Sequence, residues 1–376
     1  MFTEEQKMIE AAAARFSDEV LAPNAGRRET EKAIEPAVFS ELADMGLLGM
    51  TVSAEYDGAG ADYVSYALSL MAVAKGDGAV STVMSVHNAP FCLILERFGS
   101  EQQKAEVLRP AARGEFIGAF ALTESHAGSD ASAIRTKAVR KGDHFVINGT
   151  KQFITSGKIG KQAVVFAVTD ADLGKKGISA FLVPTDTAGY SVSKVEKKLG
   201  QNASDTCSLT FEDLVVPATA LIGDRGNGYR IALSSLEAGR IGIAAQSVGM
   251  AQAALEHAIR YAGERRSFGQ LLLEHQAVLF RLVDAKTRLA AARELVLSAA
   301  RMKDAGLPCL EQACMAKLFA SETAEAVCSA ALQTLGGYGY VEDFPIERIY
   351  RDCRVCQIYE GTSDIQKIII GRGLAA

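Results

Sequence analysis

The chain has 376 residues, of which 48% are hydrophobic and 23% charged, and its formal net charge is −5 at pH 7. This length suits two or three domains, and the composition is that of a globular protein with a large core. The charge balance disfavours nucleic-acid binding and a polybasic membrane patch, so we expect neither nucleic acid nor membrane as a partner.

The N-terminus and the cysteines bear on location and metal binding. Residues 1–5 are acidic, which predicts no signal or transit peptide, and charges interrupt the longest apolar runs before the ~20 residues of a membrane span. Seven scattered cysteines favour reduced thiols, so we expect a cytoplasmic (bacterial) protein. The spacing Cys353-Arg354-Val355-Cys356 lacks a second pair or a nearby histidine, so it predicts two buried thiols and no metal site.

Residues 1–116 read as a helical N-terminal domain. Apolar residues recur on one helical face from Met8 to Phe16, a helix is predicted over 35–45, and another over 63–74 after a glycine-rich loop. The segment 83–97 is apolar enough to be buried on most sides or to line a pocket. We therefore expect several packed helices before the first strand.

The pattern changes to strands over residues 117–222 and returns to helices over 223–376. Short β-rich runs such as 163–168 and 178–183 alternate with glycine and proline turns, which indicates a β-barrel or sandwich. No GxGxxG motif joins a strand to a helix, so a Rossmann site is not expected. A long helix is predicted over 276–304. The expected fold is mostly α with a central β domain and a C-terminal helical bundle.

Four stretches combine glycine with polar or aromatic residues. Residues 120–130 hold hydroxyls close to Gly128, and residues 152–157 hold hydroxyls close to Phe153. Each stretch suits a site for an anion or a flat ring, and each also suits an ordinary strand or bend. Residues 265–276 include two adjacent arginines that suit a pyrophosphate or a solvated loop. Residues 333–340 are a glycine cluster after a helix, which is either a C-cap or a place where backbone meets a ligand.

The stretch 358–366, Ile-Tyr-Glu-Gly-Thr-Ser-Asp-Ile-Gln, places Glu360 between a tyrosine and a glycine. A carboxylate in a water-poor pocket suits a general base, and glycine lets a ligand approach the backbone closely. The alternative is a polar loop that caps a helix beginning near Thr362 or Ser363. Local features alone leave both interpretations open.

Together these stretches resemble the acyl-CoA dehydrogenase family over essentially the whole chain. One family signature is met by 121–124 with 128–130, and the other by 333–337 with Asp343, Arg348 and Asp352. The resemblance implies the helical, β and four-helix-bundle order described above, a homotetramer arranged as a dimer of dimers, and FAD between the β domain and the bundle. It also implies fatty acid metabolism, β-oxidation or branched-chain amino acid degradation.

The resemblance also implies which residues contact FAD and substrate. Phe153 stands where the family commonly has tryptophan, and Thr155 is expected near the flavin N5 atom. The implied FAD contacts are Phe120, Ala121, Leu122, Thr123, Gly128, Ser129, Phe153, Ile154, Thr155, Thr362, Ser363 and Asp364 within the chain, and Arg265, Phe268, Gln276, Gln333, Gly336 and Gly337 toward a partner subunit's FAD. The implied acyl-CoA contacts are Ser129, Glu237, Ala238, Gly239, Arg240, Tyr359 and Gly361.

Glu360 matches the family's catalytic base. It is expected to remove the α-proton of an acyl thioester while FAD N5 accepts the β-hydrogen as hydride, giving a trans-2-enoyl-CoA. Some members place the base on the bundle helix instead, but that position is Gly239 here. Electrons are expected to pass to an electron-transfer flavoprotein.

The resemblance favours a short acyl group, straight or 2-methyl-branched, extending to medium chains. Ser81 stands where glutaryl-CoA dehydrogenases carry an arginine, which disfavours a dicarboxylyl substrate. The alternatives are an acyl-CoA oxidase, which passes electrons to oxygen, and a non-catalytic assembly protein on the same fold. A nitroalkane-oxidase-like enzyme is disfavoured, since that chemistry uses aspartate where Glu360 stands.

Overall fold

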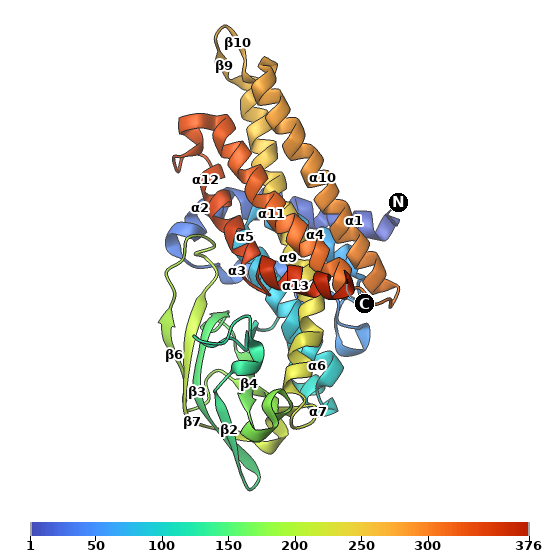
Figure 1. The fold of residues 1–376 in the computed structure, drawn as a ribbon, viewed down its shortest axis with the longest axis vertical. Helices are drawn as coiled ribbons and strands as arrows, with labels where there is room; N and C mark the ends of the chain where they lie inside the picture. Colours follow the sequence, from blue (N-terminus) through green and yellow to red (C-terminus); the bar gives the residue numbers. More distant parts are fainter. Residues whose placement is uncertain (1, 375–376) are drawn as a thin grey trace.

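A computed structural model describes residues 2–374 and shows a helical part joined to one β domain. In Figure 1 the strands β2, β3, β4, β6 and β7 lie together at the lower end, and the hairpin β9–β10 lies at the opposite end. Helices fill the length between them. The fold class predicted from the sequence, mostly helical with a central β domain, is confirmed.

The N-terminal helices begin at side chains that satisfy free backbone N–H groups. Thr3 forms a capping box with Gln6, while Asp62 and Asp77 accept N–H bonds at the starts of their helices. The helices are α1 (Glu4–Phe16), α2 (Ala22–Glu31), α3 (Pro36–Asp44), α4 (Tyr63–Gly76), α5 (Gly78–Val86), α6 (Leu93–Phe98), α7 (Glu101–Gln103) and α8 (Arg109–Ala112). Short helical turns connect several of them, including a π-helical turn η3 (His87–Cys92).

The C-terminal helices are longer. The helix predicted over 276–304 is α10, and it ends before Gly306, whose positive φ of 66° breaks the helix ahead of Pro308. The helices are α9 (Gly228–Glu264), α10 (Gln276–Asp304), α11 (Leu310–Leu335), α12 (Ile346–Cys353) and α13 (Ser363–Leu374). The short hairpin β9 (Arg266–Ser267) and β10 (Gln270–Leu271) joins α9 to α10.

N-terminal and C-terminal helices share one hydrophobic core. Leu68 and Val73 of α4 belong to the same buried cluster as Val248 of α9 and Val296 of α10. The contact is close because a Cβ at Gly249 of α9 would lie only 2.1 Å from the Met71 carbonyl oxygen. The two helical segments, distant in sequence, therefore form a single packed body.

The apolar segment Gly78–Phe98 differs from the sequence expectation. By length and hydropathy it could span a membrane, with a mean hydropathy of 1.4 over an 18-residue window, so the expectation that charges interrupt every such run was wrong. All of that window is buried inside the protein. Its apolarity is accounted for by packing in the core.

The β domain is one mixed sheet of eight strands. They are β1 (Gly118–Ala121), β2 (Lys137–Lys141), β3 (His144–Thr155), β4 (Gln162–Val168), β5 (Ile178–Pro184), β6 (Tyr190–Val195), β7 (Thr206–Pro217) and β8 (Leu221–Ile222). The order is β6-β7-β3-β2-β4-β5-β8, with β1 parallel to β4. Strands β2 and β4 are joined by one pair, Lys137 with Val168.

The sheet encloses its own core, since buried side chains of β3, β4, β5 and β7 belong to one hydrophobic cluster. The rings of Phe145 on β3 and Phe181 on β5 lie 5.0 Å apart at an interplanar angle of 64°. Among residues 2–374 the end strands β6 and β8 do not pair with each other, so the sheet is not a closed barrel. The sandwich alternative describes the arrangement better.

Candidate active site

Glu360 lies in a strained loop between the turn η10 (Arg354–Gln357) and α13. Its φ of 51° is in the left-handed region, which is uncommon for a residue with a side chain, and Gly361 follows with a φ of 92°. Two side chains donate to the Gly361 carbonyl, Lys317 Nζ at 2.6 Å and Gln366 Nε2 at 2.8 Å. The loop is therefore held from α11 and from α13.

The Glu360 carboxylate packs directly on the backbone of α9. A Cβ built on Gly239 would lie 1.8 Å from Glu360 Oε2, so only glycine leaves room for the carboxylate there. Glu360 is half-buried, but its Oε2 is fully buried and has no hydrogen-bond partner among residues 2–374. The adjacent Arg240 is 4% exposed, and its Nε likewise lacks a partner within the described part of the chain. The carboxylate of Glu360 and the guanidinium of Arg240 thus each keep a buried polar atom that a bound ligand could satisfy.

Burial controls the charge of Glu360. It raises the pKa of the carboxyl to about 7, against the smaller opposing effect of the positive charges on Lys317 and Arg240. The neighbouring Tyr359 is fixed separately, since its hydroxyl donates to Gln246 Oε1 on α9. A carboxylate near neutrality in a fixed position suits proton abstraction at physiological pH.

The β domain brings two predicted ligand stretches together. The Gln152 N–H donates to the Thr123 carbonyl at 2.9 Å, which places the loop after β1 beside the end of β3. Beneath them Lys151 Nζ lies 2.8 Å from Glu124 and 2.9 Å from the Leu122 carbonyl. Glu124 also accepts hydrogen bonds from the backbone N–H groups of Arg135 and Thr136. Burial is the largest single effect on the pKa of Glu124 and raises it, but Lys151 and the hydrogen bonds together outweigh burial, so the pKa is lowered.

Lys151→Met is expected to destabilise the protein by ~3–5 kcal/mol, because it leaves the buried Glu124 carboxylate without its countercharge. Urea unfolding of the purified protein measures the difference. Lys137→Met, at an exposed position on the neighbouring strand β2, is the control and should change little. Equal stabilities of the two variants would contradict a structural role for the Lys151–Glu124 pair.

The surface beside this pair fits a flat polar ring system. Phe153 is 59% exposed with a φ of 60°, at a register shift between β3 and β7, and Ile154 next to it is buried. The hydroxyls of Ser156 and Ser363 are buried without a partner among residues 2–374. An exposed aromatic wall suits one face of an isoalloxazine ring, and unpaired buried hydroxyls are groups that the polar edge of such a ring could satisfy.

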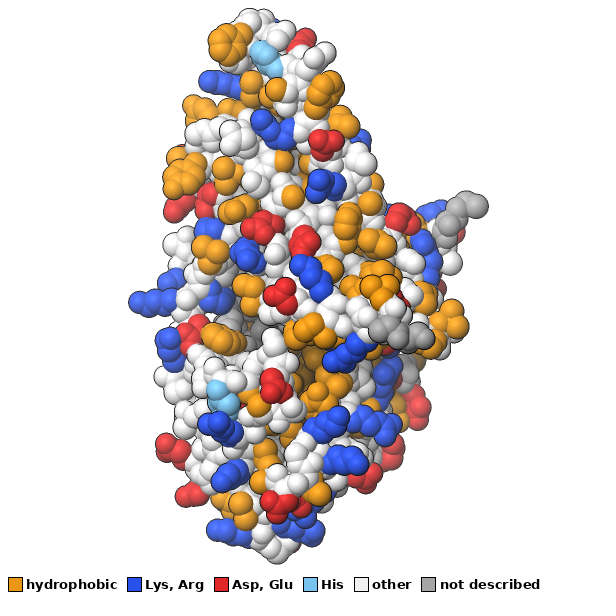
Figure 2. All heavy atoms as spheres, viewed as in Figure 1, with side chains coloured by type: hydrophobic (Ala, Val, Ile, Leu, Met, Phe, Trp, Pro, Cys, Tyr) orange, Lys and Arg blue, Asp and Glu red, His pale blue; other side chains and the backbone are white. Residues whose placement is uncertain are grey.

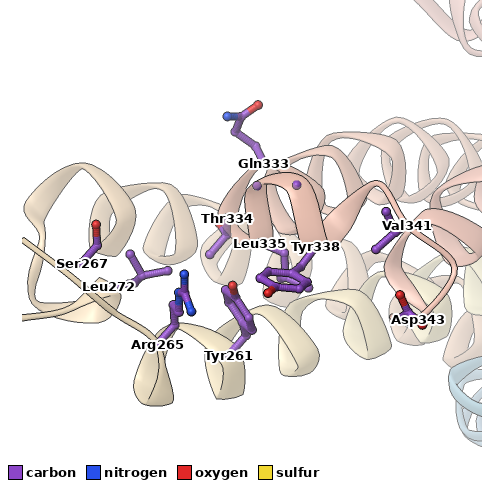
Figure 3. Close-up of a pocket in the computed structure, with 12 residues that line it drawn as sticks. Tyr261, Arg265, Ser267, Leu272, Gln333, Thr334, Leu335, Tyr338, Val341 and Asp343 are labelled. Carbon is purple, nitrogen blue, oxygen red and sulfur yellow. The ribbon is translucent and has the colours of Figure 1, made fainter.

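The predicted contacts to a partner's cofactor lie elsewhere, around a cavity of about 630 Å³ between α9 and the end of α11. Figure 3 shows Tyr261 of α9 and Arg265, which directly follows that helix, facing Tyr338, and the Arg265 guanidinium lies 5.9 Å from the Tyr338 ring centre. Gln333, Gly336 and Gly337 line the same cavity, while Phe268 is 97% exposed at the hairpin tip and Gln276 begins α10. The ends of α9 and α11 that line this cavity lie toward the end of the molecule opposite the β domain (Figure 1).

The predicted acyl-CoA contacts are divided. Gly239, Arg240, Tyr359 and Gly361 surround Glu360, whereas Ser129 is exposed on the loop after β1. Glu237 pairs with Lys303 of α10, and Ala238 packs against Ala89 and Leu93. The roles of all seven residues as acyl-CoA contacts stay predictions. On the face shown in Figure 2, hydrophobic side chains line a hollow where the helical part meets the β domain.

The buried residues that pack against the loop carrying Glu360 were not identified from the sequence. Lys317, Gln366 and Tyr66 are all buried at the Glu360 loop or beneath it, and the charge of Glu360 raises the pKa of Tyr66, a smaller effect than its burial. One signal was available. Lys317 is the only charged residue in the apolar run 313–320, so it could not reach solvent if that helix were central.

Both the sequence and the fold of this chain are similar to those of known proteins. Family models match residues 3–115 as "Acyl-CoA dehydrogenase, N-terminal domain", 119–214 as the middle domain and 226–375 as the C-terminal domain. The chain is 41% identical over 368 residues to "Acyl-CoA dehydrogenase, short-chain specific" of Clostridium acetobutylicum, covering 98% of this chain and 97% of the relative.

Two solved structures share the fold closely. The butyryl-CoA dehydrogenase of Megasphaera elsdenii has a TM-score of 0.98 and 38% identity, covering 100% of this chain and 99% of the other. A chain of the structure described as "Electron transferring flavoprotein of Acidaminococcus fermentans: Towards a mechanism of flavin-based electron bifurcation" has a TM-score of 0.98 and 41% identity, with coverage of 100% and 98%.

Proposed function

Because this chain belongs to the acyl-CoA dehydrogenase family, we propose that it oxidises a short acyl-CoA to its trans-2-enoyl-CoA, with Glu360 as the base. Membership makes it an FAD-dependent oxidoreductase, which argues against the alternative of a non-catalytic assembly protein on the same fold. The observation that carries the proposal is the Glu360 carboxylate, buried against Gly239 with a pKa raised to about 7.

Glu360 supplies the proton acceptor. The α-hydrogens of a thioester are weakly acidic, so a base with a raised pKa in a water-poor pocket removes them more readily than an exposed carboxylate does. The Glu360 backbone N–H makes no hydrogen bond to another group among residues 2–374, so it is available to the thioester oxygen as negative charge develops there. Arg240 adds positive charge at the same place.

The residues proposed to hold FAD within the chain are those around Thr123, Phe153 and Ser363. The chemistry that bound FAD supplies is acceptance of the β-hydrogen as a hydride. Phe153 would cover the ring, and the buried hydroxyls of Ser156 and Ser363 would satisfy its polar edge. The closed surroundings of Glu360 Oε2 keep water from that oxygen of the carboxylate.

The assembly and the electron acceptor are further parts of the proposal. Exposed apolar side chains at Leu279, Phe280 and Val283 follow one face of α10, which suits contact with a second copy in a homotetramer. The cavity of Figure 3 would then meet the partner's cofactor. An electron-transfer flavoprotein is the proposed acceptor, supported by the similar chain in the Acidaminococcus fermentans structure.

A panel of acyl-CoA thioesters tests the proposed function. Anaerobic mixing of the yellow protein with C4, isobutyryl, 2-methylbutyryl, isovaleryl and C8 thioesters should bleach the flavin fastest with the short straight or 2-methyl-branched groups. The relatives named short-chain and butyryl support this order. An optimum at C12–C16 would reject the substrate proposal, and rapid peroxide formation in air would favour the oxidase alternative.

A further inference from the structure

We propose that Lys317 is a positioning residue for Glu360, whose buried ammonium both holds the Gly361 carbonyl and maintains the charge balance around the catalytic carboxylate. The inference rests on the proposed role of Glu360 as the base. It concerns a residue of α11 that lies 44 positions before Gly361 in the sequence.

The first support is the cost of burying Lys317. Its side chain is 0% exposed, and its one hydrogen bond within the described residues is the 2.6 Å bond to the Gly361 carbonyl. No carboxylate in residues 2–374 forms a salt bridge with it. An ammonium buried without an ion pair is expensive, so its retention points to a need for positive charge at this place.

The second support is the set of titratable groups around the loop. Arg240 from α9, Lys317 from α11 and Tyr66 from α4 face Glu360. Cys314 of the same helix and Cys356 of η10 face Lys317, along with Arg240 and Glu360. Because only Arg240 and Lys317 are cations, they alone oppose the effect of burial on Glu360.

The sign of the effect follows from these charges. Burial favours the neutral carboxylic acid, whereas a neighbouring cation favours the carboxylate, so Lys317 lowers the pKa that burial raises. Burial also lowers the pKa of Lys317 itself to about 8. Lys317 therefore carries its charge over the pH range in which Glu360 becomes an active base.

Gln366 provides a matched control for the mechanical part of the role. Its amide donates to the same Gly361 carbonyl at 2.8 Å and to the Glu360 carbonyl at 3.4 Å, and it is also fully buried. Gln366→Met removes a neutral donor, Lys317→Met removes a charged donor, and Lys317→Gln removes the charge while keeping a donor group. The three variants separate anchoring from electrostatics.

The experiment measures flavin bleaching by butyryl-CoA from pH 6 to pH 9 by anaerobic rapid mixing. Lys317→Met and Lys317→Gln should move the acidic limb of the rate profile upward by about one pH unit, lowering the rate at pH 6 by about tenfold. Gln366→Met should leave the limb in place. Hydrogen exchange of the peptide 358–366, measured separately, should rise in Lys317→Met and Gln366→Met, since both lose an anchor.

Each outcome decides a different claim. Wild-type protein that no acyl-CoA bleaches would reject the proposed function, whatever the variants do. Wild-type bleaching with an unmoved limb in Lys317→Gln would reject the inference and leave the function intact. If Lys317→Met does not fold, Lys317→Gln alone carries the test, because the expected limb shift depends on charge and not on the shape of the side chain.

Discussion

Glu360→Gln is expected to lower the rate of flavin bleaching by acyl-CoA at least ~10²–10⁴-fold while FAD and acyl-CoA still bind. The amide has nearly the shape of the carboxylate and fits against Gly239, but it cannot accept the α-proton. Rapid mixing measures the rate, and equilibrium titration measures binding. Glu322→Gln on α11, where Glu322 pairs with the surface Lys367, is the control. Near-normal bleaching by Glu360→Gln would remove Glu360 from the mechanism.

Although Glu360→Gln lowers activity, it is expected to raise the stability of the protein at high pH. The pKa of Glu360 lies near 7 in the folded protein, above its ordinary value of about 4.3 in an unfolded chain. Below about pH 4 the carboxyl is neutral in both states, whereas above about pH 7 folding must bury a charge. Glu360→Gln should therefore melt at a higher temperature than wild type above pH 7, and the difference should disappear in acid.

Gly239→Ala is expected to reduce the bleaching rate by roughly 100-fold without unfolding the protein. The added methyl group would lie 1.8 Å from Glu360 Oε2, so the carboxylate must move, and a displacement of about 1 Å is enough to cost that factor. The obstacle is the end of a flexible side chain and not backbone, so α9 itself is undisturbed. Melting temperature and rate together test this separation of activity from stability.

Gly263→Ala is the matched control for Gly239→Ala. It lies on the same helix, and a Cβ there meets no atom of residues 2–374 within 4 Å. Alanine favours a helix by up to ~1 kcal/mol over glycine, so this variant should be as stable as wild type or more stable, with full activity. If both variants lost activity equally, crowding of Glu360 would not be the cause.

The sequence was most informative where local chemistry decides the structure. Helix α10 spans the predicted residues because Gly306 and Pro308 end it, and α13 begins at Ser363 as a polar cap predicts. The order of the strands in the β sheet was not predictable in the same way. It includes the single pairing of Lys137 with Val168, a long-range contact with no local pattern.

The candidate site shows the same division. Glu360 and Gly239 stand out in the sequence once the family resemblance is seen, and the structure adds why they belong together, namely the contact of the carboxylate with the helix backbone. Lys317 and Gln366 were not predicted, since each acts on a backbone carbonyl that the sequence does not identify, and the only sign of Lys317 is its place as the one charge in an apolar run. The division into domains at 116 and 222 stays a prediction.

The core shared by α4 and α9 constrains how the protein is made. The apolar faces of α4 emerge from the ribosome well before α9, and about 150 residues lie between Gly76 and Gly228, or roughly 8–30 s of synthesis at ~5–20 residues per second. During that interval side chains such as Leu68 and Val73 have no native cover from α9. The nascent chain therefore passes through a stage in which an apolar helical segment is synthesised but still lacks the part of its native cover that α9 provides.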